Sequence, residues 1–107
     1  MIKLVYCISR KPGMKRADFS HYWLTKHALL GARIPGLRKL VQSHAIEVAG
    51  DAAGPDFDGM AELWFDDAAA LLAARQSEAW KESTADEANF IDPNRTAYFV
   101  TEEKEIL

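Results

Sequence analysis

Histidines are the side chains of this sequence best suited to proton transfer. Phe19, Trp23 and His27 are spaced four residues apart, so they share one face of a helix predicted from about residue 16 to residue 32. A histidine on an apolar face can serve as a general acid or base, because an imidazole titrates near neutral pH. The same placement also suits a core histidine bonded to a backbone carbonyl, so both interpretations of His27 stay open. His21 is predicted to lie on the polar side of this helix and is assigned no role.

A second histidine lies on a predicted strand. His44 alternates with Gln42 and Ile46, so the three side chains share one strand face. On a cavity-facing surface, His44 and Gln42 would hydrogen-bond a carbonyl group of a substrate. At a strand end, His44 would instead contact solvent or a partner subunit, and this interpretation is preferred. On the next strand Glu62 is expected to form an ion pair, with Arg38 or another base, because a buried lone carboxylate is costly.

Aromatic side chains form the second group of candidates. They suit the binding of a flat hydrophobic ligand, but they suit a plain core equally well. The substrate-binding candidates are Tyr6, Trp23, His44, Trp64 and Phe90. Trp23 fits the core interpretation better, whereas Tyr6 and Trp64 would line a cavity if their strand faces point away from the helices.

Composition excludes several classes of protein. The chain has 107 residues, 49% hydrophobic and 27% charged, with a formal net charge of −3. A general nucleic-acid binder is expected to be basic, and no apolar run is long enough to span a membrane. The sequence has no cluster of cysteine, histidine and carboxylate residues that would predict a metal site. It also has no glycine-rich phosphate-binding motif that would predict a nucleotide cofactor. A lone cysteine, Cys7, and the lack of a signal segment favour a cytoplasmic protein.

The elements that must position these side chains follow from hydrophobic periodicity and turn residues. Strands are predicted at residues 2–9, 37–48, 59–65 and 95–103, and helices at 16–32, 68–74 and 78–85. The order β-α-β-β-α-β predicts one domain over residues 1–107, an α+β ferredoxin-like plait with a four-stranded antiparallel sheet. The helices would all cover one sheet face and leave the other face exposed. We therefore expect a homodimer through that face, forming a dimeric α/β barrel.

Several motifs resemble the EthD family when taken together. They are IKLVYCISRKPGM at 2–14, F-x-x-Y-W-x-x-x-H at 19–27, R-I-P-G-L-R at 33–38, V-Q-S-H at 41–44, A-E-L-W-F at 61–65 and D-E-A-N-F-I-D at 86–92. The resemblance covers nearly the whole chain and implies a dimeric α+β barrel. Family members often carry proline two residues after the helix histidine, but here the run is His27-Ala28-Leu29-Leu30. Without that proline, the helix is predicted to continue regularly past His27.

The resemblance also adds a partner for His27. In the D-E-x-x-F-x-D pattern, one of Asp86 or Asp92 would orient the imidazole, and Asp86 is preferred because Asp92 precedes Pro93 and is explained as a turn cap. Glu87 is interpreted as a solvated residue at the helix end.

Three functions stay open at this stage. The first is cofactor-free acid/base chemistry on a hydrophobic or aromatic small molecule, of the isomerase, cyclase or dehydratase type, with His27 and Asp86 as the catalytic pair. The second is a non-catalytic accessory role in a catabolic oxidoreductase system, because the family is named after ether degradation by a monooxygenase system. The third is a dimerising binding module without catalysis.

Overall fold

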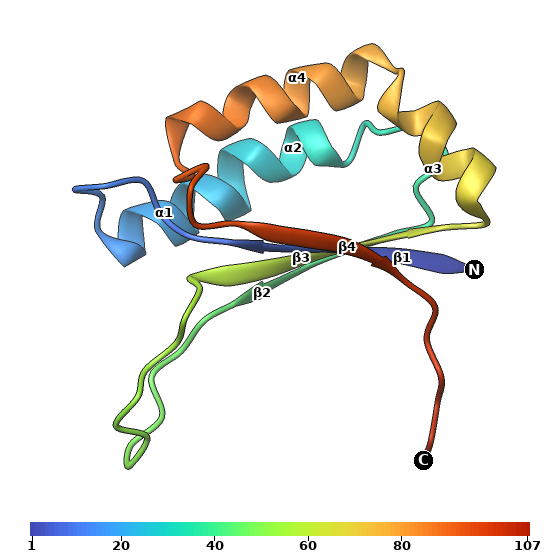
Figure 1. Cartoon of the computed structure of the whole chain (residues 1–107). Coiled ribbons are helices and arrows are strands. Elements are labelled where there is room, and N and C mark those ends of the chain that lie inside the picture. The colour runs from blue at the N-terminus through green and yellow to red at the C-terminus, as the bar shows by residue number, and fades with distance from the viewer.

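The computed structural model describes the whole chain, residues 1–107, as one sheet with a helical layer on one side (Figure 1). The strands are β1 (Ile2–Ile8), β2 (Lys39–His44), β3 (Gly59–Phe65) and β4 (Ala97–Thr101). They lie in the order β2-β3-β1-β4, and every neighbouring pair is antiparallel. This is the predicted α+β ferredoxin-like plait.

Two helical arms form the layer above the sheet. The first arm contains α1 (Arg16–Tyr22), a π-helical turn (Trp23–His27) and α2 (Ala28–Gly31). The second contains α3 (Ala68–Arg75), α4 (Glu78–Asp86) and a short 3-10 turn (Glu87–Asn89). Asp67 accepts a hydrogen bond from the Ala70 amide, and Ser77 accepts one from the Trp80 amide. These two N-caps explain why the second arm is divided between α3 and α4.

Alternation along the strands separates the two sheet faces. Leu4, Ile8, Leu63 and Phe65 point toward the helices and are buried. Lys3 and Glu62 lie on the other face, where the ammonium of Lys3 is 2.7 Å from a carboxylate oxygen of Glu62. The core thus lies between the sheet and the helices, and no helix covers the other face (Figure 1).

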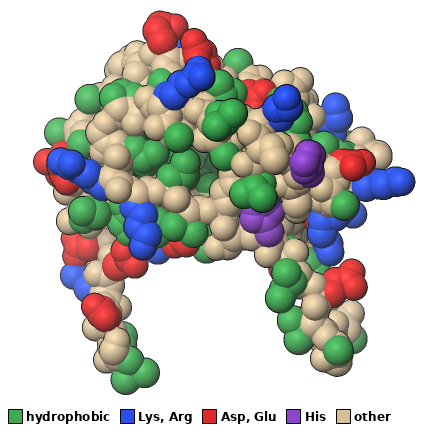
Figure 2. All heavy atoms as spheres, turned by 180° about the vertical axis from the view of Figure 1, so that it is seen from behind, with side chains coloured by type: hydrophobic (Ala, Val, Ile, Leu, Met, Phe, Trp, Pro, Cys, Tyr) green, Lys and Arg blue, Asp and Glu red, His purple; other side chains and the backbone are tan.

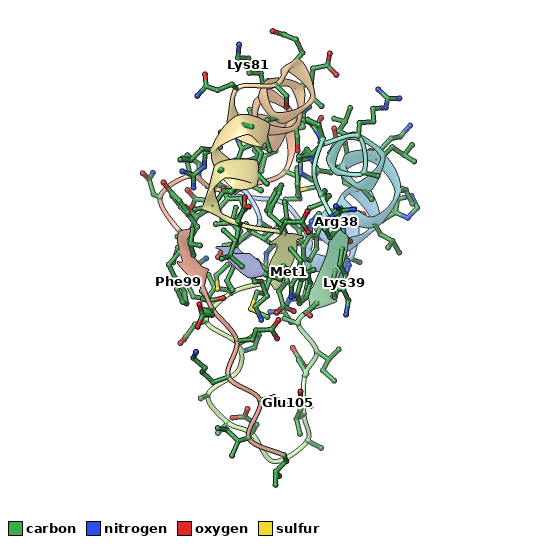
Figure 3. All side chains as sticks on the ribbon, turned by 90° about the vertical axis from the view of Figure 1, so that its right-hand side faces the viewer. Met1, Arg38, Lys39, Lys81, Phe99 and Glu105 are labelled. Carbon is green, nitrogen blue, oxygen red and sulfur yellow. The ribbon has the colours of Figure 1, made fainter.

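Two extended segments project on the uncovered side of the sheet. They are the loop between β2 and β3 and the chain after β4, and both descend away from the helices in two views (Figures 1 and 3). The Asp58 carboxylate is buried where the loop rejoins the sheet, and it accepts hydrogen bonds from Arg10 and Arg16. This ion cluster fixes the base of the loop to the beginning of the first helical arm.

The predicted and observed elements differ mainly at strand ends. The predicted strands 37–48 and 95–103 are shortened to 39–44 and 97–101. Beyond β2 only single backbone hydrogen bonds continue the pairing, from the Arg38 amide to the Trp64 carbonyl and from the Ala45 amide to the Asp58 carbonyl. The first helix continues past His27 as the regular helix α2, as predicted, whereas the segment before it, Trp23–His27, is an unpredicted π turn. None of the helices has the length and apolar character needed to cross a membrane.

Candidate functional site

The main cavity lies between the sheet and the helical layer. Its volume is about 460 Å³, and its lining is mostly apolar. The sheet contributes Leu4, Tyr6 and Leu63, among others, and the first helical arm contributes Trp23 and His27. Figure 2, which views the molecule from behind Figure 1, shows a hollow surrounded by hydrophobic side chains. A cavity of this size and character falls within the usual range for sites that bind small organic molecules.

His27 is held at the cavity wall by Asp86. The imidazole Nδ1 lies 2.8 Å from Asp86 Oδ2, and each side chain is 13% exposed. Burial favours the neutral carboxyl group, but hydrogen bonds from Tyr22, His27 and Asn89 outweigh it and hold the pKa of Asp86 below its ordinary value. An ionised Asp86 accepts the proton of Nδ1, so the neutral imidazole presents an unprotonated Nε2.

The other nitrogen of His27 faces the second helical arm. The hydroxyl of Ser83, on α4, lies 3.5 Å from Nε2. Both residues line the cavity. Since 3.5 Å is long for a strong hydrogen bond, Nε2 is open to accept a proton from a bound molecule.

The π turn positions this histidine. The Ala28 amide donates to the carbonyl of Trp23, five residues earlier, so the helix is locally widened over residues 23–27. Trp23 is 2% exposed and packs against the core, and His27 lies at the other end of the turn. Turns of this kind are frequent at functional sites, because they displace one side chain from the regular helical face.

A second polar pair lines the same cavity from below. The hydroxyl of Tyr6, on β1, donates to Glu87 Oε1 at 3.0 Å. Burial raises the pKa of Glu87; the Tyr6 hydrogen bond opposes this effect, and the adjacent charge of Asp86 adds to it. Burial also raises the pKa of Tyr6, assisted by the Glu87 carboxylate. Glu87 is therefore partly buried in the cavity wall, not solvated as the sequence suggested, because the 3-10 turn after α4 directs it toward β1.

The remaining candidates lie in different surroundings. Phe90 is fully buried and packs against the rings of Tyr22 and His27, so it supports the histidine from behind and does not line the cavity. His44 stacks on Trp23 and bonds to Gln42, in a more open groove of about 600 Å³ between the first helical arm and β2; Gln42 also lines the main cavity. Burial lowers the pKa of His44.

Trp64 is the one candidate on the opposite sheet face. Tyr6 and Trp64 lie on opposite faces: Tyr6 points toward the helices and lines the cavity between the layers, whereas Trp64 points away from the helices and does not line it. The Trp64 indole donates to Glu103 and lies beneath the ammonium groups of Lys3 and Lys39. The partner of Glu62 is Lys3, whereas Arg38 pairs with an exposed aspartate.

A family model for the EthD domain matches residues 11–94. The chain belongs to the EthD family. An ethyl tert-butyl ether degradation (EthD) family protein from Bacillus halodurans is 28% identical, with a TM-score of 0.77 over 97% of this chain and 99% of that one. No curated protein is a significant match.

More distant structures share the fold of this EthD-family chain. SnoaB from Streptomyces nogalater, described as a cofactor-independent oxygenase, is 14% identical, with a TM-score of 0.67 over 99% of this chain and 95% of that one. A protein of unknown function from Thermobifida fusca, described as dimeric and ferredoxin-like, is 17% identical, with a TM-score of 0.70 over 94% and 88% of the two chains.

Proposed function

We propose that this EthD-family protein binds a hydrophobic ring compound in the main cavity and performs cofactor-free acid/base chemistry on it. The observation that carries the proposal is the pair formed by Asp86 and His27, with Nδ1 bonded to the carboxylate and Nε2 free at the wall of an apolar cavity. Asp86 fixes the tautomer and stabilises the imidazolium that forms when Nε2 takes a proton. The reaction would be of the isomerase, cyclase or dehydratase type.

The apolar lining supports this chemistry. Most of the residues that line the cavity are apolar, so a bound ring compound would be surrounded largely by hydrocarbon and would displace water from its own place. Tyr6 and Trp23 supply flat surfaces for an aromatic ligand. The proposal assigns no role to His44 or Trp64 in that cavity.

An accessory role in an oxidoreductase system is the second candidate. It is favoured by the name of the related Bacillus halodurans protein and by the description of SnoaB as a cofactor-independent oxygenase. In that role the apolar walls would hold an intermediate and His27 would not transfer a proton. A purely dimerising module is a third possibility, but the polar pairs in the cavity would then have no use.

The working unit is proposed to be a homodimer in the cytoplasm, formed through the uncovered sheet face. Phe99 lies on that face and is 57% exposed, at the opposite edge of the sheet from Lys39 (Figure 3). The Thermobifida fusca protein of the same fold is described as dimeric. The two projecting segments would contact the second copy, because both extend from the uncovered side of the sheet.

Deuterium exchange tests the proposed chemistry directly. The bicyclic ketone α-tetralone is incubated with the protein in D₂O, and the loss of its α-proton signal is followed by NMR. The expected result is exchange above the buffer rate, reduced by about 100-fold or more in His27→Ala, the range typical of a general base. His21→Ala is the matched control, because His21 is exposed on the same helical arm.

The first two candidate functions give different results in this experiment. Loss of exchange in His27→Ala alone supports acid/base chemistry. Binding of α-tetralone without exchange favours the accessory role. Equal exchange in the wild type and in His27→Ala contradicts the proposal.

A further inference from the structure

The cavity contains a second proton-handling group that the pair of His27 and Asp86 does not use. We infer that Glu87, held by Tyr6, donates a proton to the carbonyl oxygen of a bound ketone while His27 removes a proton from the neighbouring carbon. The inference rests on the proposed function and names its substrate class: a carbonyl compound with an acidic C–H next to the carbonyl group.

The first observation is that both groups border one space. His27 and Glu87 line the same cavity, one from the first helical arm and the other from the turn after α4. Ser83, which lies beside His27 Nε2, precedes Glu87 by four residues. Glu87 begins the 3-10 turn that continues α4, so it lies about one helical turn beyond Ser83, about 6 Å along the axis.

This spacing fits one ligand between two proton-transfer groups. Each group works at a heavy-atom distance of about 2.6–3.2 Å from the atom with which it exchanges a proton. A carbonyl oxygen and the adjacent carbon of one ketone therefore fit between Glu87 and His27. An isolated alkene or ether would offer no use for the second group.

The second observation is how Tyr6 holds the carboxyl group. The Tyr6 hydroxyl donates to Oε1, 3.0 Å away, which leaves Oε2 of Glu87 to carry a proton. A protonated carboxyl group then has one oxygen accepting from Tyr6 and the other donating to the ligand. Tyr6 is thus a positioning residue that sets the direction of the O–H bond.

The third observation is the contrast between adjacent carboxyl groups. Asp86 accepts hydrogen bonds from three side chains, whereas Glu87 accepts one. Burial and the charge of Asp86 raise the pKa of Glu87, so its protonated form is favoured relative to that of Asp86. Neighbouring carboxyl groups with opposed environments commonly divide the acid and base roles.

The step balances without any further reactant. Nε2 of His27 takes the proton from the carbon, and the C–H electron pair forms a carbon–carbon double bond. The carbonyl π pair moves to oxygen, which takes the proton of Glu87. The products are an enol, an imidazolium paired with Asp86, and the carboxylate of Glu87. The imidazolium then gives its proton to a carbon of the enol, and the enol O–H returns its proton to the Glu87 carboxylate. Protonation of the original carbon completes an exchange, and protonation of a conjugated carbon further along the ligand completes an isomerisation; both groups are restored.

The decisive variant is Glu87→Gln. Glutamine has nearly the same shape and still accepts from Tyr6, but it cannot give up a proton. We expect the exchange rate of α-tetralone to fall by about tenfold or more, while the dissociation constant for α-tetralone changes by less than about threefold. Glu82→Gln is the matched control, because Glu82 is an exposed residue of α4.

The outcomes separate this inference from the proposed function. If His27→Ala abolishes exchange and Glu87→Gln exchanges at the wild-type rate, Glu87 is not the donor and the inference is overturned alone. If binding and exchange fall together in Glu87→Gln, the residue only holds the ligand, and the inference again fails. If His27→Ala has no effect, the proposed function fails and the inference fails with it.

A measurement on the wild type guards against a variant that does not fold. The carbonyl stretch of bound α-tetralone, labelled with ¹³C at the carbonyl, is recorded by infrared difference spectroscopy. A shift to lower frequency relative to the ligand in an apolar solvent is expected, because a hydrogen bond weakens the C=O bond. An unshifted band would refute proton donation by Glu87.

Discussion

Gly59 tests whether Trp23 is fixed at the cavity wall as the structure places it. Gly59 is the first residue of β3 and pairs with His44 on β2. A methyl group added there would lie 2.7 Å from Cη2 of Trp23, closer still to Cζ3, and 2.9 Å from the carbonyl oxygen of Ser43. Carbon atoms pack best at about 3.5–4.0 Å, so Gly59→Ala creates a steric overlap with both the ring and the strand.

The loss of stability in Gly59→Ala depends on whether the neighbouring groups can move away from the added methyl group. Ser43 belongs to the β2–β3 ladder, and the Trp23 indole is 2% exposed, so neither neighbour can yield freely. Overpacking of a rigid core costs about 1–3 kcal/mol, and we expect the upper end of this range. For a domain of this size, about 3 kcal/mol lowers the melting temperature by about 12 °C or more.

The assay is thermal unfolding followed by circular dichroism. Gly31→Ala is the matched control, because its methyl group would meet only the flexible end of Leu40, at 3.3 Å, and alanine favours a helix. We expect its melting temperature to stay within about 4 °C of the wild type. The double variant Gly59→Ala, Trp23→Phe should lose less stability than the two single variants summed, since phenylalanine lacks the clashing ring atoms.

One result would refute this reasoning. If Gly59→Ala melts with the wild type, Trp23 does not pack over the start of β3, and the cavity wall described above is misplaced.

Three further perturbations test the ion cluster, the uncovered face and the orientation of the imidazole. Asp58→Asn should lower the free energy of unfolding by about 1.5–3 kcal/mol at pH 7 by urea titration, whereas Asp66→Asn, in an exposed pair, should have a much smaller effect. Burial opposes the ionised form of Asp58, but the bonds and charges of two arginines hold its pKa below its ordinary value of 3.8. This contribution is therefore present above pH 3.8 and is lost as the pH falls below it; a gap between wild type and Asp58→Asn that persists at pH 2 would contradict the assignment. Phe99→Asp should yield monomers in analytical ultracentrifugation, while Leu72→Asp, equally exposed on α3, should leave the dimer intact; a dimeric Phe99→Asp would count against the uncovered face. Asp86→Asn should slow the exchange of α-tetralone by at least about tenfold, because asparagine does not fix the tautomer of the imidazole, and unchanged exchange would remove Asp86 from the mechanism.

Local patterns account for most of the architecture. The helices predicted at 68–74 and 78–85 agree with α3 and α4, because in each case a short polar side chain that caps the helix, Asp67 or Ser77, precedes a run of helix-forming residues. The strands near residues 2–9 and 59–65 were predictable from the alternation of apolar and polar residues. The uncovered sheet face was predictable because the chain has only enough helices to cover one side. The π turn was not readable, because the extra residue leaves no local signal in the apolar spacing.

The site was only partly predictable. The spacing of Phe19, Trp23 and His27 placed the histidine on the buried side of its helix, and the acidic motif placed Asp86 near it. Which sheet face meets the helices cannot be predicted from alternation, which is symmetric, so the sequence could not place Tyr6 and Trp64 on opposite faces. The sequence also gave no reason to separate Glu87 from a solvated helix end.

The sequence by itself determined the order of elements, the family and the histidine most suited to chemistry, since these depend on local propensity and on motifs within short segments. Tertiary structure alone decided that Asp86 meets His27 across 59 residues and that Tyr6 meets Glu87 across 81. Such contacts depend on how one sheet face packs beneath two helical arms. The same packing makes two adjacent carboxyl groups, Asp86 and Glu87, chemically different.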